Sequence, residues 1–224
     1  MSATKAGHPI EGSTTLRVTG PEWTRLQDPA TASAGDPLAR TLADCGAAPV
    51  RATLFAVDQD RGVRTEFFLL GERAVLVSRR LAKIEGSIRI EPGAQVTFSL
   101  VDDLWPGVAR TLPDVPQLRA PASEAAGTPD RELDLPEPDR EALLARETFA
   151  LQVTVEAWPD SDAETPKVLW ARHWSVADDR LLDVRAGEGT VKLVERPAGS
   201  VAAELRWALV GAMDATAARA AESH

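Results

Sequence analysis

Apolar and polar residues alternate along two stretches of the chain, and each stretch ends in apolar residues at helical spacing. The first begins near Val50, where a period of two predicts strands over 51–57, 63–70, 74–78 and 87–90 joined by short turns. Beyond Pro92 the apolar positions fit one face of an amphipathic helix; they are Val96, Leu100, Val101, Leu104, Val108 and Leu112. This part of the chain therefore predicts an antiparallel meander followed by a helix.

The same order of elements returns in the second half. The segment DREALLAR predicts a short helix, alternation predicts strands over 149–158, 168–176, 181–185 and 190–194, and a helix follows from Pro197 with Val201, Leu205, Leu209 and Met213 on one stripe. Residues 86–105 also match 189–209, with Gly86 opposite Gly189 and Ile90 opposite Leu193. We expect two related halves in which strands 87–90 and 190–194 are equivalent and each is followed by an equivalent helix.

The amino end and the middle of the chain complete this organisation. Leu16–Val18 predicts an edge strand, the spacing of Thr19 and Glu22 predicts a capping box for a helix that ends at Leu26, and a second helix is expected over Pro37–Cys45 with Cys45 buried. Residues 113–137 are rich in Pro, Ala, Asp and Glu, which predicts a polar, extended connector.

The expected fold class is α+β. Two pseudo-symmetric halves, each an antiparallel β-meander flanked by helices, share a central sheet with a helical layer. A single domain over 15–219 contains half-repeats 15–112 and 138–219 with the linker 113–137, and it is bounded by a disordered leader (1–14) and a tail (220–224).

The composition indicates a sizeable core and an acidic surface. Of the 224 residues 44% are hydrophobic, and the formal net charge is −9. No basic face is set aside for a phosphate backbone, so no nucleic acid is expected as a partner. The single Cys45 excludes an internal disulfide, the amino end lacks the apolar region of a signal peptide, and no apolar run suits a membrane span. A cytoplasmic protein without membrane insertion is expected.

No residue pattern indicates catalysis, a metal or a cofactor. Most paired aspartates fall in predicted turns, where a carboxylate bonds backbone N–H groups: Asp58 with Asp60, Asp160 with Asp162, and Asp178 with Asp179. Asp102 and Asp103 fit the solvated face of a helix. His173 lies in a strand without a nucleophile or second base, and Gly187-Glu188-Gly189 precedes a strand and is too short to cradle a phosphate. We therefore expect a binding protein rather than an enzyme, with no catalytic residue, no metal and no cofactor.

Aromatic residues are the remaining candidates. Strict alternation places Trp170, Arg172 and Trp174 on one face of a strand. Phe67 and Phe68 point to opposite faces of another strand, which is therefore expected to be central and covered on both sides. Core packing accounts for such residues, but aromatic and arginine side chains are also enriched at interfaces. The candidate partner-binding residues are Phe68, Trp170, Arg172 and Trp174, with core and interface both left open.

With this order of elements the chain resembles the EspG family, the cytosolic chaperones of mycobacterial type VII (ESX) secretion. The resemblance rests on PEWTRL at 21–26, VDDLWPGVARTLPDVP at 101–116, and HWSVADDRLLDV followed by TVKLVERPAGSVAAELRWAL near the carboxyl end. It covers roughly Thr15 to Ala217, and the chain is similar to a short and divergent member.

The resemblance implies a non-enzymatic chaperone that binds the tip of a PPE protein in a PE–PPE pair through its sheet and carboxyl-terminal helical region, and keeps that partner soluble and export-competent. Two alternatives stay open. One is a structural or regulatory actinobacterial protein-interaction module. The other is a small-ligand-binding protein with a cavity between sheet and helices that the tryptophans would line. A homodimer is compatible with each.

Overall fold

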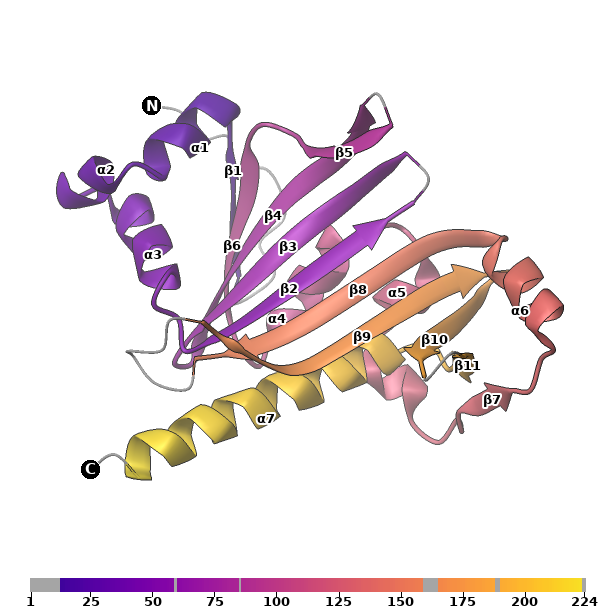
Figure 1. The fold of residues 1–224 in the computed structure, drawn as a ribbon. Helices are drawn as coiled ribbons and strands as arrows, with labels where there is room; N and C mark the ends of the chain where they lie inside the picture. The colour runs from indigo at the N-terminus through magenta and orange to yellow at the C-terminus, as the bar shows by residue number, and fades with distance from the viewer. Residues whose placement is uncertain (1–12, 59, 85, 159–164, 188–189, 223–224) are drawn as a thin grey trace.

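Eleven strands form one antiparallel sheet in the computed structural model, which describes residues 13–58, 60–84, 86–158, 165–187 and 190–222 (Figure 1). In chain order the strands are β1 (Thr14–Val18), β2 (Val50–Val57), β3 (Arg61–Leu70), β4 (Arg73–Ile84), β5 (Ser87–Ile90), β6 (Ala94–Leu100), β7 (Arg131–Leu133), β8 (Glu147–Ala157), β9 (Lys167–Ala177), β10 (Arg180–Ala186) and β11 (Val191–Arg196).

The strand order contains two matching halves. Along the sheet it is β1-β6-β4-β3-β2-β8-β9-β10-β11-β7, with β5 paired to β4. The meander β2-β3-β4-β6 thus mirrors β8-β9-β10-β11 across the central β2–β8 pair, in which Val50 lies opposite Ala157. The predicted α+β fold, with two pseudo-symmetric halves that share one sheet, is confirmed.

Helices cover the sheet unequally on its two faces. On the front face of Figure 1, α1 (Gly20–Leu26), α2 (Pro29–Ser33) and α3 (Pro37–Cys45) pack over β3, β4 and β6, and α6 (Glu137–Leu144) packs near β10 and β11. The back face carries α4 (Leu104–Thr111), α5 (Pro116–Arg119), the 3₁₀ turn η1 (Ala122–Ala125) and α7 (Ser200–Glu222). None of the described helices is both long and apolar enough to cross a membrane.

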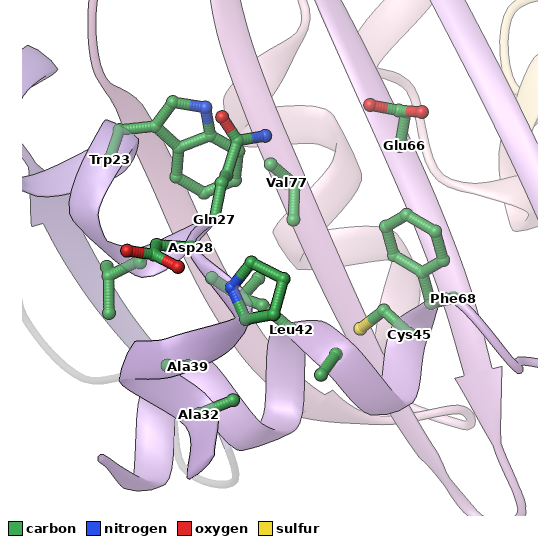
Figure 2. A pocket seen from close by; sticks show the side chains of 13 residues that line it. Trp23, Gln27, Asp28, Ala32, Ala39, Leu42, Cys45, Glu66, Phe68 and Val77 are labelled. Atoms are coloured by element: carbon green, nitrogen blue, oxygen red, sulfur yellow. The ribbon is translucent and has the colours of Figure 1, made fainter. Parts of the chain in front are cut away.

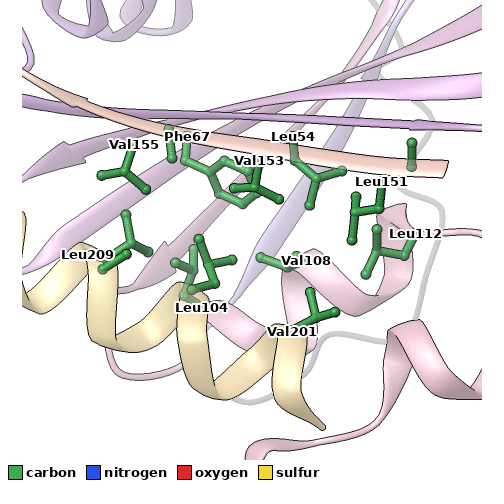
Figure 3. Packing of buried hydrophobic residues seen from close by; sticks show 14 of the residues in the cluster. Leu54, Phe67, Leu104, Val108, Leu112, Leu151, Val153, Val155, Val201 and Leu209 are labelled. Carbon is green, nitrogen blue, oxygen red and sulfur yellow. The ribbon is translucent and has the colours of Figure 1, made fainter. Parts of the chain in front are cut away.

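The main core lies between the sheet and the back helices, where apolar side chains from alternate strand positions meet one stripe of α4 and of α7 (Figure 3). Its members include Leu54, Phe67, Leu104, Val108, Leu112, Leu151, Val153, Val155, Val201 and Leu209. Full burial of one such side chain contributes about 1.5–3 kcal/mol relative to exposure, so this cluster is the largest source of stability.

Several local predictions are confirmed. α3 has the predicted bounds because the Asp36 carboxylate accepts the backbone N–H groups of Leu38 and Ala39, and Cys45 at its end is buried. β3 is covered on both faces, since Phe67 lies in the main core and Phe68 lies beneath α1–α3.

The helix predicted directly after Pro92 is wrong. Residues 94–100 form β6, and the helix α4 begins only at Leu104. Val96 and Leu100 are four residues apart, a spacing that keeps two side chains on one face in a strand as well as in a helix. Pairing decides the outcome, because Val96 lies opposite Leu16 of β1 on one side and Val77 of β4 on the other.

The internal repeat therefore matches a different pair of strands from the pair predicted. β11 corresponds to β6 in the strand order, and each of these strands is followed by a back-face helix, α7 and α4. β5, which the sequence equated with β11, is an additional short strand beside the tip of β4. The predicted equivalence of 87–90 with 190–194 is therefore wrong.

Two smaller expectations also fail. The Thr19 hydroxyl makes no capping bond to α1, whose first bond runs from the Trp23 N–H to the Thr19 carbonyl. The segment 113–137 is not simply an extended connector, because it folds into α5, η1 and β7 and places Leu118 in the main core. Burial of Leu118 holds this otherwise polar segment against the main core.

Candidate protein-binding surface

The helix α7 has two apolar faces, and only one of them is covered. Val201, Leu205 and Leu209 are buried in the main core and Met213 packs at its edge, which confirms the predicted stripe. Trp207 and Val210, three residues apart, fall together on the opposite side. They are 71% and 47% exposed. We name these two residues the α7 outer face.

Trp207 is the most exposed large apolar side chain among the described residues. Tryptophan is enriched at protein interfaces because its large rigid ring buries much apolar area at a small entropic cost. Trp207 is not among the binding residues predicted from the sequence, although its position off the Leu205–Leu209 stripe already indicated that it lies on the solvent side of the helix.

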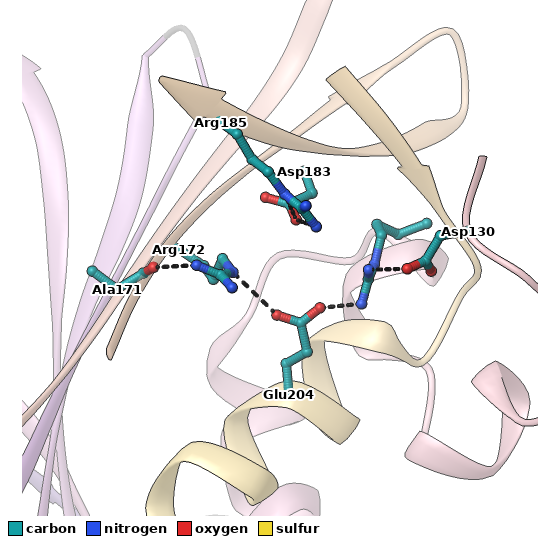
Figure 4. A network of polar contacts seen from close by, with 7 residues as sticks. Asp130, Ala171, Arg172, Asp183, Arg185 and Glu204 are labelled. Atoms are coloured by element: carbon teal, nitrogen blue, oxygen red, sulfur yellow. Dashed lines mark hydrogen bonds and ion pairs between the residues drawn. The ribbon is translucent and has the colours of Figure 1, made fainter. Parts of the chain in front are cut away.

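A group of charged residues holds the start of α7 against the sheet (Figure 4). The Glu204 carboxylate accepts a hydrogen bond from Arg196 of β11 and forms an ion pair with Arg172 of β9, with 3.5 Å between Nε and Oε2. Arg196 also donates to Asp130. Burial raises the pKa of Glu204, and the charge of Arg196 opposes this rise. Glu204 lies one turn before Trp207, so these bonds fix the rotation of α7 next to its outer face.

Asp183 is a buried charge that is not among the residues predicted from the sequence. It is fully buried on β10, and its Oδ2 accepts a hydrogen bond from Arg185 Nε at 2.8 Å, whereas Oδ1 has no hydrogen-bond partner among the described residues. It lies on the same sheet face as buried Leu181, and its charge contributes to the raised pKa of Glu204. An aspartate at an inward position of the strand LLDV was the available signal.

The predicted arrangement of the β9 aromatics is confirmed, and of the two roles left open for Trp174 its burial favours the core. Trp170 and Trp174 share a face with ring centroids 5.7 Å apart, and the Arg172 guanidinium lies 5.7 Å from the Trp170 centroid. Trp174 is 0% exposed because it lies in the main core, which α7 covers. Trp170 and Arg172 are half-buried, so this pair reaches the surface beside α7. Their role in partner binding stays a prediction.

Phe68 is also buried, as expected of a strand covered on both sides, so of the two roles left open by the sequence its burial favours core packing over partner binding. It lies beneath α1–α3, where the Arg51 guanidinium stands 5.1 Å from its ring centroid. The sequence predicted that this side of β3 is covered, and the structure shows that α1–α3 cover it.

A pocket of about 380 Å³ opens between α1–α3 and the sheet (Figure 2). Trp23, Phe68 and Val77 contribute to its apolar walls, while Gln27, Asp28 and Glu66 are polar. The tryptophans expected to line such a cavity, Trp170 and Trp174, are absent from its walls. Cys45 also lines the pocket, and burial raises the pKa of its thiol to about 12, so it is a thiol rather than a reactive thiolate.

Two of the predicted turn aspartates, Asp58 and Asp178, have structural partners. Asp58 accepts the backbone N–H groups of Asp60 and Arg61, as expected of a turn residue, and Asp178 forms an ion pair with Arg146 at 2.9 Å. His173 is exposed. Asp160, Asp162 and part of Gly187–Gly189 lie outside the described residues. Within the described ranges no three His, Cys, Asp or Glu side chains are grouped as metal ligands.

The fold and these surfaces define an α+β protein whose accessible candidate residues suit contact with another molecule. No family model and no curated protein matches the chain. Among solved structures it is similar to the Mycobacterium tuberculosis type VII secretion system chaperone EspG5, determined in complex with a PE25–PPE41 dimer. The two chains share 12% identity with a TM-score of 0.49, over 90% of this chain and 96% of that one. At this level the similarity assigns neither a family nor a function.

Proposed function

We propose that this protein is a non-enzymatic cytoplasmic chaperone that binds a helical secretion substrate of PE/PPE type and keeps it soluble before export by a type VII system. The α7 outer face carries the proposal, because it presents Trp207, 71% exposed, on a helix whose rotation is fixed by the core and by Glu204. The nature of the substrate follows from the resemblance of the sequence to the EspG family.

The chemistry of the α7 outer face suits an apolar helix as the partner. Trp207 and Val210 form a short apolar ridge, and Gly211 beside them has no side chain, so an approaching helix can come close to the α7 backbone. Arg172 of β9 pairs with Glu204 near the start of α7 and lies over Trp170, so this half-buried pair flanks α7 on the sheet. When a helical substrate packs on this ridge, its own apolar surface is covered, and this would prevent the substrate from aggregating.

The test is co-expression with small helical proteins encoded beside the gene, followed by co-purification and calorimetric titration of the complex. Trp207→Ala should weaken binding at least about tenfold, since a buried interface tryptophan is a typical hot spot. Leu100→Ala is the matched control, because Leu100 is also an exposed apolar residue but lies on β6. If Trp207→Ala binds the partner as tightly as the parent chain, α7 is not part of the binding site. If no helical neighbour co-purifies, the chaperone proposal is refuted.

A further inference from the structure

The strand β5 has an open edge. Ser87–Ile90 pairs with residues 81–84 of β4 on one side, and no described strand pairs with it on the other. β1 occupies the equivalent edge of β6 but ends at Val18, opposite Ala94. There the chain turns into α1, and Gly20 packs so closely on Pro92 that an added Cβ would lie 2.7 Å from the proline side chain. The edge beyond this turn is therefore unoccupied in the described part of the chain.

The hydrogen-bonding direction of β5 can be derived from its register. The Glu91 N–H donates to the Arg80 carbonyl at 2.8 Å, and these residues continue the register that pairs Leu81 with Ile90. Hydrogen-bonded pairs alternate along an antiparallel ladder, so Arg89 is the next β5 residue whose N–H and C=O point to β4. The N–H and C=O groups of Ile88 and Ile90 consequently point away from β4, toward the open edge.

The side chains at this edge are apolar and basic. Ile88 and Ile90 lie on one face, 54% and 39% exposed, and Arg89 lies between them on the other face. Residues 79–90 contain Arg79, Arg80, Lys83 and Arg89 against one acidic residue, Glu85, in a chain of formal net charge −9. Among the described residues no carboxylate forms an ion pair with Arg80, Lys83 or Arg89.

We propose that the β5 edge binds an extended acidic segment of a partner protein as an added strand. Its backbone pairs with the outward groups of Ile88 and Ile90, two apolar residues of the segment pack beside these isoleucines, and a carboxylate between them lies beside Arg89. Cross-strand apolar pairs and opposite charges both stabilise such an addition. The recognised pattern is apolar–acidic–apolar. This surface is separate from the α7 outer face, so the inference stands or fails independently of the proposed function.

A second copy of this chain fits the edge less well. Two copies could pair their β5 edges antiparallel, with the outward N–H and C=O groups of both isoleucines bonded in each copy. This pairing places Ile88 of one copy opposite Ile90 of the other. Arg89 then lies directly opposite Arg89. Like charges directly opposite each other are destabilising. An acidic segment turns the same position into an attraction.

The probes are two fluorescein-labelled peptides, Ser-Val-Glu-Val-Glu-Val-Ser and its counterpart with lysine at both glutamates, titrated with the full chain at low salt by fluorescence anisotropy. The acidic peptide should bind and the lysine peptide should not. Arg89→Glu and the double variant Ile88→Thr with Ile90→Thr should each weaken binding at least about fivefold. Arg73→Glu and Val168→Thr, two exposed positions on other parts of the sheet, are the matched controls, and Val168 has the same 54% exposure as Ile88.

A second measurement tests directly which β5 amides bond to the peptide. Bound acidic peptide should slow amide hydrogen exchange at Ile88 and Ile90 and leave Arg89 nearly unchanged, because the Arg89 N–H already bonds to β4. The proposal is overturned if the acidic peptide does not bind, or binds both variants as tightly as the parent chain. It is equally overturned if protection appears at Arg89 instead. If the parent chain self-associates and Arg89→Glu abolishes this, the occupant of the edge is a second copy and the proposal is overturned. If the chain binds anionic lipid vesicles in preference to the peptide, the occupant is a membrane and the proposal is likewise overturned.

Discussion

Trp174→Ala is the substitution that separates a core tryptophan from an interface tryptophan in this fold. Sequence alternation leaves both roles open for Trp174, whereas the structure buries it completely between β9 and the back helices. The free energy of unfolding should therefore fall strongly, before any partner is added.

The magnitude follows from burial. Replacing a fully buried tryptophan by alanine removes its packing and leaves a cavity, at a cost of about 3–5 kcal/mol. The indole N–H of Trp174 has no hydrogen-bond partner among the described residues, so the loss is one of packing. For a chain of this size each kcal/mol lowers the melting temperature by about 2–4 °C, which predicts a decrease of about 6–20 °C.

Urea denaturation followed by circular dichroism and scanning calorimetry measures this change without relying on tryptophan fluorescence. Trp207→Ala is the matched control, because the same chemical change at a 71% exposed position should alter stability by no more than about 0.5 kcal/mol. Trp174→Phe, which keeps an aromatic ring, should lose less than Trp174→Ala and provides a measurable variant if the alanine change prevents folding. A loss below about 1 kcal/mol for Trp174→Ala, or equal losses for the two alanine variants, would refute the assignment of Trp174 to the core.

Two further predictions concern a glycine and a helix cap. At Gly199 φ is 88° and an added Cβ would lie 2.9 Å from the backbone N of Ala125, whereas Gly127 has φ 80° and nothing within 4 Å of that point. Gly127→Ala should therefore cost about 1–2 kcal/mol of strain and Gly199→Ala clearly more, and equal costs in urea denaturation would contradict the close packing. The backbone N–H of Ala39 holds the pKa of Asp36 below its usual 3.8, so the stabilisation by this carboxylate is present above that pH and lost as the pH falls through the folded-state pKa. Asp36→Ala should lower the melting temperature at neutral pH and Asp36→Asn should restore most of it, with the difference between parent and alanine variant shrinking in acid; a pH-independent difference would contradict this role.

The elements that the sequence predicted well are those in which pattern and pairing agree. β2 alternates over its whole length, while β3 and the first part of β4 carry apolar residues on both faces, and all three strands lie in the inner part of the sheet. α3 was predictable because Pro37 follows a capping Asp36 and Gly46 follows its end. Such signals are local, so one sequence is sufficient to read them.

The errors arose where the deciding contact lies far away along the chain. Residues 94–100 satisfy both periods, and their pairing with β4 and with β1, which lies some eighty residues earlier, selects the strand. The burial of Trp174, which the sequence left open, is non-local in the same way, because it depends on the core that α7 covers. Alternation shows which residues share a face and leaves open which face is covered.

The exposure of Trp207 is by contrast a consequence of the whole arrangement of α7. A rotation that buried Trp207 would turn Leu205 and Leu209 away from the main core and would separate Glu204 from Arg172 and Arg196. Each loss costs free energy, since two buried leucines would become exposed and two arginines would lose their shared carboxylate. The apolar stripe and the ion pairs therefore select the same rotation independently, and that rotation places the tryptophan in solvent. A partner that covers Trp207 gains apolar burial that the isolated fold cannot obtain by rearranging itself.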